Sequence, residues 1–383
     1  MKNNTLIRNI AVLLVVALVC VMTGQIYLKQ LKNDTFYTAN PNITKVLHLS
    51  DYNPNLKGTA NDVEVYVFDS GVPGGKALIY GGTHTNEVGS MLSAVTYLEN
   101  AKCEVGTLYI MVHANNSGYS HTQPLLGQGN KMTFDLADGT TREFRIGTRI
   151  SNPVHQWPDP NYHLNTSKRE LKHEEIAEIR NLNRNHPGEE SGYLTEMTCY
   201  AIRNLINTEN IDFIYDGHEA GGESVRLVNY LVVHENAIPL GSAAVMNCVI
   251  NNLPFKLEIS GQTSYGLSHR GLGDNTNALC TLFETCNPAM GGYHDKMTED
   301  LFKNGRSGNY LAMHQAGLFP NSYDFDENGW PIEKRTAYHM SMSLELINTL
   351  ETLYPDKPMK VTGMPDANEM IEKGLEYTLK SLA

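Results

Sequence analysis

Short apolar runs alternate with helical patterns along most of the chain. Residues 63–68 and 77–80 are runs of the buried-strand type, and the second run ends in two glycines. After Glu87 the apolar positions follow helical spacing, at Met91, Leu92, Val95 and Leu98. A further strand is expected over 106–112. Strand, tight turn, helix and strand in this order predict a right-handed crossover and a parallel pair of strands.

The alternation continues after a long irregular segment. Residues 115–180 lack a regular pattern, apart from a hairpin expected around Asp138-Gly139. Because this segment directly follows a strand, we expect it to line or cover a pocket. Further elements are expected as helices over 194–208, 237–253, 336–354 and 368–382, strands over 211–215, 227–233 and 278–283, and a glycine-rich loop over 261–274. The pattern predicts an α/β fold with a mixed, mostly parallel twisted sheet flanked by helices.

The N-terminal segment has the composition of a membrane helix. Residues 10–28 are uncharged and mostly apolar, which is long enough to cross a bilayer. No small-x-small cleavage site is obvious, so we predict an uncleaved anchor over 1–32, with the rest of the chain outside the cytoplasm, at the cell surface or in the periplasm. A cleaved signal peptide, which would give a secreted protein, is the alternative. The polar stretch 33–59 is predicted to be a linker to one domain over 60–383.

The charge and the cysteine content of the chain argue against several kinds of binding site. A net charge of −12 over 383 residues argues against a nucleic-acid surface and against a basic membrane-binding face. Cys20 lies in the apolar segment, and no Cys-x-x-Cys pair occurs among the other five cysteines, which argues against a cysteine zinc site. Whether Cys280 pairs with Cys286 is open.

Three predicted strand ends carry metal-binding or acid–base side chains. His84 and Glu87 follow the first strand, His218 follows the strand over 211–215, and Glu284 follows the strand over 278–283. The carboxyl ends of parallel strands lie along one edge of a sheet, where open α/β sheets bind ligands. Two histidines and a carboxylate suit a catalytic zinc site with one position left for water. Glu284 is then placed to take a proton from that water.

One basic residue is a candidate for binding an anionic substrate. Arg184, preceded by Asn183, offers a planar fork for a carboxylate. Further cations are expected in the pocket, without a ranking among Arg142, Arg145, Arg149, Arg226 and Arg270. Tyr265 is a candidate substrate contact. Two other histidines near the motifs, His113 and His186, are taken as structural.

Four motifs, taken together and in order, resemble a known group of enzymes. They are GGTHTNE at 81–87, LNRNHPG at 182–188, DGHEA at 216–220 and TLFET at 281–285. This set resembles the zinc carboxypeptidase superfamily and, within it, the succinylglutamate desuccinylase/aspartoacylase family. The resemblance covers roughly residues 60–290.

The resemblance implies roles for six residues. It makes His84, Glu87 and His218 the ligands of one zinc ion per chain and Glu284 the general acid/base, and it assigns the substrate carboxylate to Asn183 and Arg184. Three departures leave all the ligands in place but put the substrate identity in doubt: Thr85 for the usual Gly, Asn181 for the usual Asp, and Gly217 for the usual Leu.

The expected function is that of a membrane-anchored zinc hydrolase that cleaves an amide next to a free carboxylate. Its substrate would be a small N-acyl amino acid or a peptide, and its membrane contact would run through residues 10–28. Three alternatives stay open: a carboxypeptidase acting on cell-wall peptides, a binding protein that kept the fold and lost turnover, and a non-haem iron oxygenase, which also uses two histidines and a carboxylate.

Overall fold

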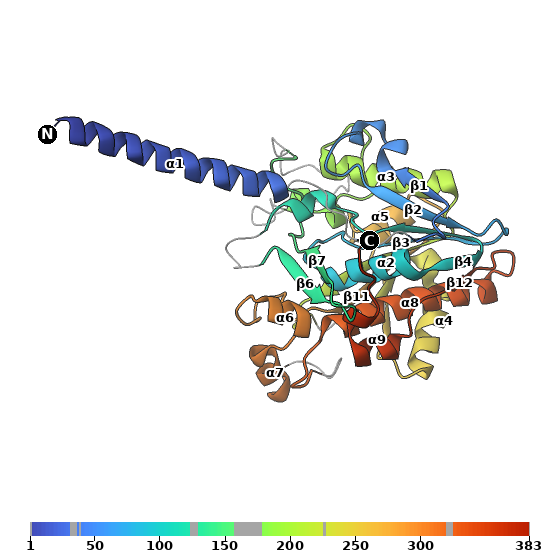
Figure 1. Cartoon of the computed structure of the whole chain (residues 1–383). Coiled ribbons are helices and arrows are strands. Elements are labelled where there is room, and N and C mark those ends of the chain that lie inside the picture. The colour runs from blue at the N-terminus through green and yellow to red at the C-terminus, as the bar shows by residue number, and fades with distance from the viewer. Residues whose placement is uncertain are drawn as a thin grey trace. The chain divides into compact units, whose positions relative to one another are not determined.

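The computed structural model describes residues 2–30, 37, 40–122, 129–156, 178–224, 227–318 and 325–382 (Figure 1). The chain divides into two compact units, Met1–Thr35 and Phe36–Ala383. The first unit is helix α1, Lys2–Gln30. Its stretch Asn4–Lys29 is long and apolar enough to cross a membrane, a property that signal sequences share. Its function as an anchor stays a prediction.

The second unit is built on one eight-stranded sheet, with the strand order β1-β2-β5-β3-β8-β11-β9-β10. The bounds of these strands are, in chain order, β1 Lys45–His48, β2 Glu64–Asp69, β3 Lys76–Tyr80, β5 Thr107–Met111, β8 Phe213–Ala220, β9 Tyr230–Val233, β10 Lys256–Ile259 and β11 Leu279–Cys286. Strands β3 and β5 carry no charged residue apart from Lys76, as expected for strands covered on both faces, whereas β8 and β11 carry charged residues toward their carboxyl ends.

The centre of the sheet is parallel and its margins are mixed. Strand β3 pairs parallel to β5 and to β8, and β8 pairs parallel to β11. The expected crossover from β3 to β5 is thus confirmed. Strands β1, β2 and β5 pair antiparallel, β9 runs antiparallel to β11, and β10 runs parallel to β9. The predicted fold class, a mixed and mostly parallel sheet flanked by helices, is confirmed.

Helices cover both faces of this sheet (Figure 1). Helices α2 (Val88–Asn100), α4 (Ile238–Ile250) and α8 (Ile332–Leu353) pack on one face, where Ala77 and Ile79 of β3 join their apolar core. Helix α3 (Leu194–Glu209) packs on the other face, against Leu78 and Tyr80. Successive residues of one strand therefore belong to different cores. For the same reason, successive residues at the site face opposite sides of the sheet and have different neighbours.

Smaller elements complete the unit. They are the two-stranded sheets β4 (Lys102–Val105) with β12 (Lys360–Thr362) and β6 (Lys131–Asp135) with β7 (Thr141–Arg145), and the helices α5 (Ser268–Gly273), α6 (Glu299–Asn304), α7 (Gly308–Gln315) and α9 (Ala367–Lys373). The pair β6–β7 is the hairpin expected around Asp138-Gly139, joined antiparallel along its whole length.

Some elements differ from the expectation. Strand β8 runs on to Ala220, so His218 stands within the strand and not after it. The loop expected over 261–274 contains helix α5, and the last helix ends at Lys373. The segment expected to be a linker carries β1, which extends the sheet by pairing with β2. Part of the irregular segment, residues 123–128 and 157–177, lies outside the described residues, so its expected covering of the pocket stays a prediction there.

All six cysteines are free in the structure. Cys280 and Cys286 stand six residues apart on the extended strand β11, which separates them by about 20 Å. A disulfide requires Cα atoms within about 7 Å, so the pairing left open above does not fit this strand.

Candidate metal and substrate site

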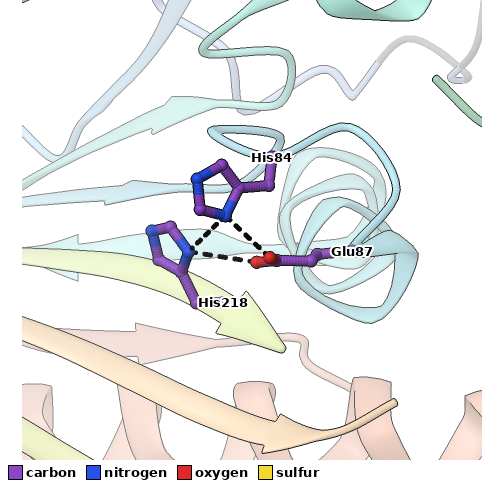
Figure 2. Close-up of side chains that lie close together, drawn as sticks. All are labelled: His84, Glu87 and His218. Carbon is purple, nitrogen blue, oxygen red and sulfur yellow. Dashed lines mark hydrogen bonds and ion pairs between the residues drawn. The ribbon is translucent and has the colours of Figure 1, made fainter. Parts of the chain in front are cut away.

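Two histidines and a glutamate converge at the end of the central strands (Figure 2). Nδ1 of His84 lies 2.7 Å from Oε1 of Glu87, and Nδ1 of His218 lies 3.2 Å from Nδ1 of His84. Nδ1 of His218 also lies 3.0 Å from Oε2 of Glu87. All three residues are buried. His84 stands in the loop after β3, and Glu87 immediately precedes α2 rather than lying within its first turn.

Oxygen atoms behind the two rings direct their Nδ1 atoms toward the centre. Nε2 of His84 lies 2.9 Å from Oδ1 of Asn181, and Nε2 of His218 lies 3.0 Å from Oδ2 of Asp216. When a metal ion is bound, these oxygens accept the hydrogen on each Nε2, and the lone pair of each Nδ1 is left for the ion. This is the ring orientation found in histidines that bind metals.

The charges of the trio also favour a cation at its centre. Burial disfavours charge on all three groups, yet Asp216 and Glu87 raise the pKa of His218 well above its usual value. The two histidines in turn hold the pKa of Glu87 below its usual range despite burial. These opposite shifts have one cause, because the carboxylates of Asp216 and Glu87 favour positive charge at this point.

The trio fits a metal ion in donor type and in spacing. Two imidazole nitrogens and a carboxylate oxygen are a donor set that zinc accepts. Tetrahedral ligands about 2.1 Å from zinc lie about 3.4 Å from one another, and the observed separations are 2.7–3.2 Å. The cluster is therefore preformed, and a small outward movement of its side chains makes room for an ion.

A further glutamate faces the same space from the neighbouring strand. Glu284 of β11 pairs in register with His218 of β8. Its Oε2 is buried and has no hydrogen-bond partner among the described residues. Burial raises the pKa of Glu284 to about 8, with a further upward contribution from Glu87. A carboxyl group with this pKa exchanges protons near neutral pH.

A cavity of about 440 Å³ joins these groups to the predicted carboxylate anchor. Its walls include His84, Glu87 and Glu284, together with Asn183 and Arg184. His218 contacts both His84 and Glu87. The structure therefore brings all six predicted site residues to one place.

The amide of Asn183 is fixed by a backbone group. Its Oδ1 accepts a hydrogen bond of 2.7 Å from the backbone N–H of Ser268, at the start of α5. Because the oxygen is occupied in this way, the NH₂ group of this buried side chain is the part that remains to donate to a ligand in the cavity. Asn183 therefore adds a neutral donor beside the Arg184 guanidinium.

Of the five arginines considered as further cations of the pocket, the structure places Arg149 in the cavity wall. Its Nε lies 3.1 Å from Oε1 of Glu178, whose Oε2 lies 3.5 Å from Nε of Arg184. Glu178 thus places a carboxylate between two arginines. This contact demonstrates, within the chain itself, the kind of group that the pair binds.

The other candidates lie elsewhere or in structural contacts. Arg142 forms a buried ion pair with Glu99, Arg270 pairs with Asp274 and Glu235 outside the metal trio, and Arg145 belongs to the β6–β7 hairpin. Arg226 lies outside the described residues. His186 is buried and His113 is partly buried, and neither takes part in the trio. Tyr265 is 46% exposed and is not part of the cavity wall.

The sequence reasoning missed three residues of the site. Asp216, which holds His218, could have been found because alternate residues of a strand share a face. Glu178 carries no signal in the sequence. Asn181 was noted only as a departure, and its oxygen serves His84 as a carboxylate would.

Comparisons with known proteins give similarity in structure only. No protein-family model matches the sequence, and no curated protein matches it. Solved structures do. A metallo-carboxypeptidase from Burkholderia cenocepacia is 13% identical with a TM-score of 0.44, over 82% of this chain and 66% of that one. A succinylglutamate desuccinylase from Silicibacter sp. TM1040 is 16% identical with a TM-score of 0.37, over 60% and 55%.

A third similar structure is the tripeptide-bound cell shape determinant protein Csd4 from Helicobacter pylori. It is 12% identical with a TM-score of 0.42, over 78% of this chain and 56% of that one. The chain thus spans no more than 66% of the length of any of the three proteins. Carboxypeptidases and a succinylglutamate desuccinylase, the two groups that the motifs resemble, both occur among the similar structures.

Proposed function

We propose that this protein is a zinc-dependent hydrolase that cleaves an amide bond next to a free carboxylate, in an N-acyl amino acid or a peptide. The observation that carries the proposal is the preformed trio of His84, Glu87 and His218 in a cavity shared with Glu284 and Arg184. Metal ligands, a proton acceptor and an anion anchor are the three parts that such a reaction needs.

The trio would hold the zinc ion. A zinc ion in such a site supplies a Lewis acid that polarises a carbonyl group and acidifies water. Asn181 and Asp216 keep the two histidine rings in the binding orientation, and the backbone N–H of Glu219 donates 2.9 Å to Oε2 of Glu87. These outer contacts fix the ligands before any substrate arrives.

Glu284 moves the proton. Its carboxylate takes a proton from the attacking water as the oxygen bonds to the amide carbon, and it returns that proton to the nitrogen as the C–N bond breaks. The products are a carboxylic acid and a free amine. Oε2 of Glu284 is suited to this task because none of the described residues forms a hydrogen bond with it.

Asn183 and Arg184 bind the substrate carboxylate and so set the distance of the scissile amide from Glu284. Arg149 adds a second positive charge on the same wall. Binding requires the substrate carboxylate to replace that of Glu178 on these arginines.

The experiment is a paired substrate screen on the full-length chain, purified in detergent and loaded with zinc. N-acyl amino acids and peptides with a free C-terminal carboxylate form one set, and the same compounds with that carboxylate amidated form the control set. We expect hydrolysis of members of the first set only. Equal hydrolysis of both sets contradicts the carboxylate anchor, and hydrolysis of neither, with zinc bound, contradicts the proposed activity.

The two substrate types also separate the rival activities. Turnover confined to N-acyl amino acids indicates a deacylase, and turnover confined to peptides indicates a carboxypeptidase, including one that acts on cell-wall peptides. An extracytoplasmic location through residues 10–28 is part of the proposal, and protease protection of the domain in intact cells tests it.

A further inference from the structure

Strands β9, β10 and β11 and helix α5 form one side of the cavity, and the space along this side is called the second chamber. Apolar side chains of Val232, Leu267 and Leu282 form part of its wall, and its polar side chains include those of Glu258, Ser260 and His269. Nothing in the proposed reaction uses His269, although it is 3% exposed and stands beside the space that a substrate would fill.

His269 is held by a chain of hydrogen bonds that begins at a buried arginine. Nδ1 of His269 lies 2.7 Å from Oγ of Ser260. The same Oγ lies 3.3 Å from Nε of Arg270, and Nη2 of Arg270 donates 2.7 Å to the backbone oxygen of Ser260. All three side chains are at least 95% buried.

The direction of these bonds fixes the hydrogen on the ring. An arginine can only donate, so Oγ of Ser260 accepts from Arg270 and has its own hydrogen left to give. Donation to Nδ1 of His269 is the arrangement that leaves no buried hydroxyl hydrogen unpaired among the described residues. The ring then carries its hydrogen on Nε2, for which the described residues offer no acceptor. Burial lowers the pKa of His269 to about 3 and keeps the ring neutral.

The charge around this chamber disfavours an anion. Arg270 already pairs with Asp274 at 3.1 Å and with Glu235 at 3.3 Å, so its positive charge is more than balanced. Glu258 adds a negative charge to the wall. The opposite holds near Asn183, where Arg149 and Arg184 outnumber the single carboxylate of Glu178.

We infer that His269, oriented by Ser260, is a specificity-determining residue that donates a hydrogen bond from Nε2 to a neutral oxygen acceptor on the substrate side chain, such as a carboxamide or ester carbonyl. The inference rests on the proposed function, since it takes the substrate carboxylate to lie at Arg184. It selects a glutamine-like side chain over a glutamate-like or purely aliphatic one of equal length.

Four ligands test this in the full-length chain with Glu284→Gln, loaded with zinc in detergent, so that binding is measured without turnover. They are N-acetyl-glutamine, the γ-methyl ester of N-acetyl-glutamate, N-acetyl-glutamate and N-acetyl-norleucine. By calorimetry we expect the first two to bind about tenfold more tightly than the last two, because only they satisfy the buried donor without bringing a charge.

Two variants and one control locate the effect. Adding His269→Leu should remove the preference, and Ser260→Ala should reduce it, because the ring loses the partner that sets its hydrogen. His48→Leu makes the same change at an exposed position of β1 and should keep the full preference. Zinc content and thermal unfolding are measured for each protein, so that a loss of fold is recognised.

The outcomes separate this inference from the proposed function. Binding of all four ligands with equal affinity overturns the inference and leaves the proposed function standing. If the glutamine derivative binds tightly and the ester does not, the ring accepts a hydrogen bond at Nε2 instead of donating one. This result overturns the inference as well. If none of the four binds, the inference falls, and the substrate screen described above, which includes peptides, decides whether the proposed function falls as well. An unchanged preference in the Ser260→Ala protein contradicts the orienting role of that residue.

Discussion

Two glutamates on adjacent strands, Glu219 of β8 and Glu284 of β11, show how one sheet separates structure from chemistry. Glu219 is buried and Glu284 is partly buried, and burial raises the pKa of each. Both residues line the cavity, but the side chain of Glu219 pairs with Arg335 of α8, whereas Glu284 stands in register with His218 on the strand face of the metal trio. Neighbouring positions of one sheet thus hold the same functional group in two very different settings.

The difference lies in the partners of the two carboxylates. Glu219 receives Nη1 of Arg335 at 3.2 Å and Nδ2 of Asn287 at 2.9 Å. Asn287 also donates 3.3 Å to the backbone oxygen of Asn86, beside the proposed ligand Glu87. Glu284 has a buried oxygen for which the described part of the chain offers no partner. A carboxylate whose oxygens are all hydrogen-bonded stabilises the fold under the site. A carboxylate with an unbonded oxygen remains available for proton transfer.

The largest expected effect is on the cavity side. Glu284→Gln should lower the turnover number by about 10²–10⁴ while zinc stays bound, because the proton acceptor is lost and the metal ligands are not. The free energy of unfolding should stay equal or rise, since the variant removes a carboxylate that lacks a partner. Steady-state kinetics with zinc analysis on the same sample measures both, and unchanged turnover excludes Glu284 as the acid/base.

The matched change on the other face should act on stability. Glu219→Gln leaves Arg335 as a buried charge without a counter-ion and should cost about 3–5 kcal/mol of the free energy of unfolding. Denaturant unfolding measures it. The control is Glu143→Gln, which breaks the Lys131–Glu143 pair whose side chains are half exposed, for a cost below about 1 kcal/mol. Equal costs for the two variants contradict the structural role of Glu219.

The anion anchor offers a smaller effect on the cavity face. Arg184→Met should raise KM about 10–100-fold through the loss of a charge-assisted hydrogen bond, with little change in zinc content. Glu178→Gln should lower KM instead, because the carboxylate that competes for Arg149 and Arg184 becomes neutral. A rise of KM in both variants shows that Glu178 helps to build the anchor and does not compete with the substrate.

The smallest effect is the pH dependence of the α8 face. Burial, with the charge of His218, lowers the pKa of His339 from 6.5 to about 3. Between these values the unfolded chain binds a proton that the folded chain refuses, so the free energy of unfolding falls as the pH falls through this window.

A variant isolates this contribution. His339→Phe should make the loss of stability shallower by about 1.4 kcal/mol per pH unit between pH 6 and pH 4. Denaturant unfolding of the metal-free chain at several pH values gives the slope, and parallel slopes for the variant and the wild type contradict the assignment.

Local patterns predicted the centre of the sheet and most of the metal trio. The strand, glycine turn and helix around His84 place Glu87 through backbone geometry alone, and the order of the four motifs placed Glu284 and Arg184 in the same cavity. The short helix α5 was missed because its six residues, two of them glycines, make less than two helical turns, too few for a periodic signal.

Long-range contacts could not be predicted. Arg335 lies 116 residues from Glu219 along the chain. No local pattern in the sequence distinguishes Glu219, which has an ion-pair partner, from Glu284. The strand β10 was missed because Lys256–Ile259 is four residues long, too short for an alternation to show. Residue type alone therefore indicates the chemistry at a strand end, while the partners decide whether it is used.

The central claim is that the trio holds a metal ion in an enzyme site. The most direct test is the zinc content of the purified full-length chain compared with that of His218→Ala, with the exposed Glu143→Gln as a control that keeps all three ligands. We predict about one zinc per chain in the wild type and the control and close to none in His218→Ala. An absence of zinc from the wild type after incubation with the ion, or equal content in all three proteins, would contradict the account.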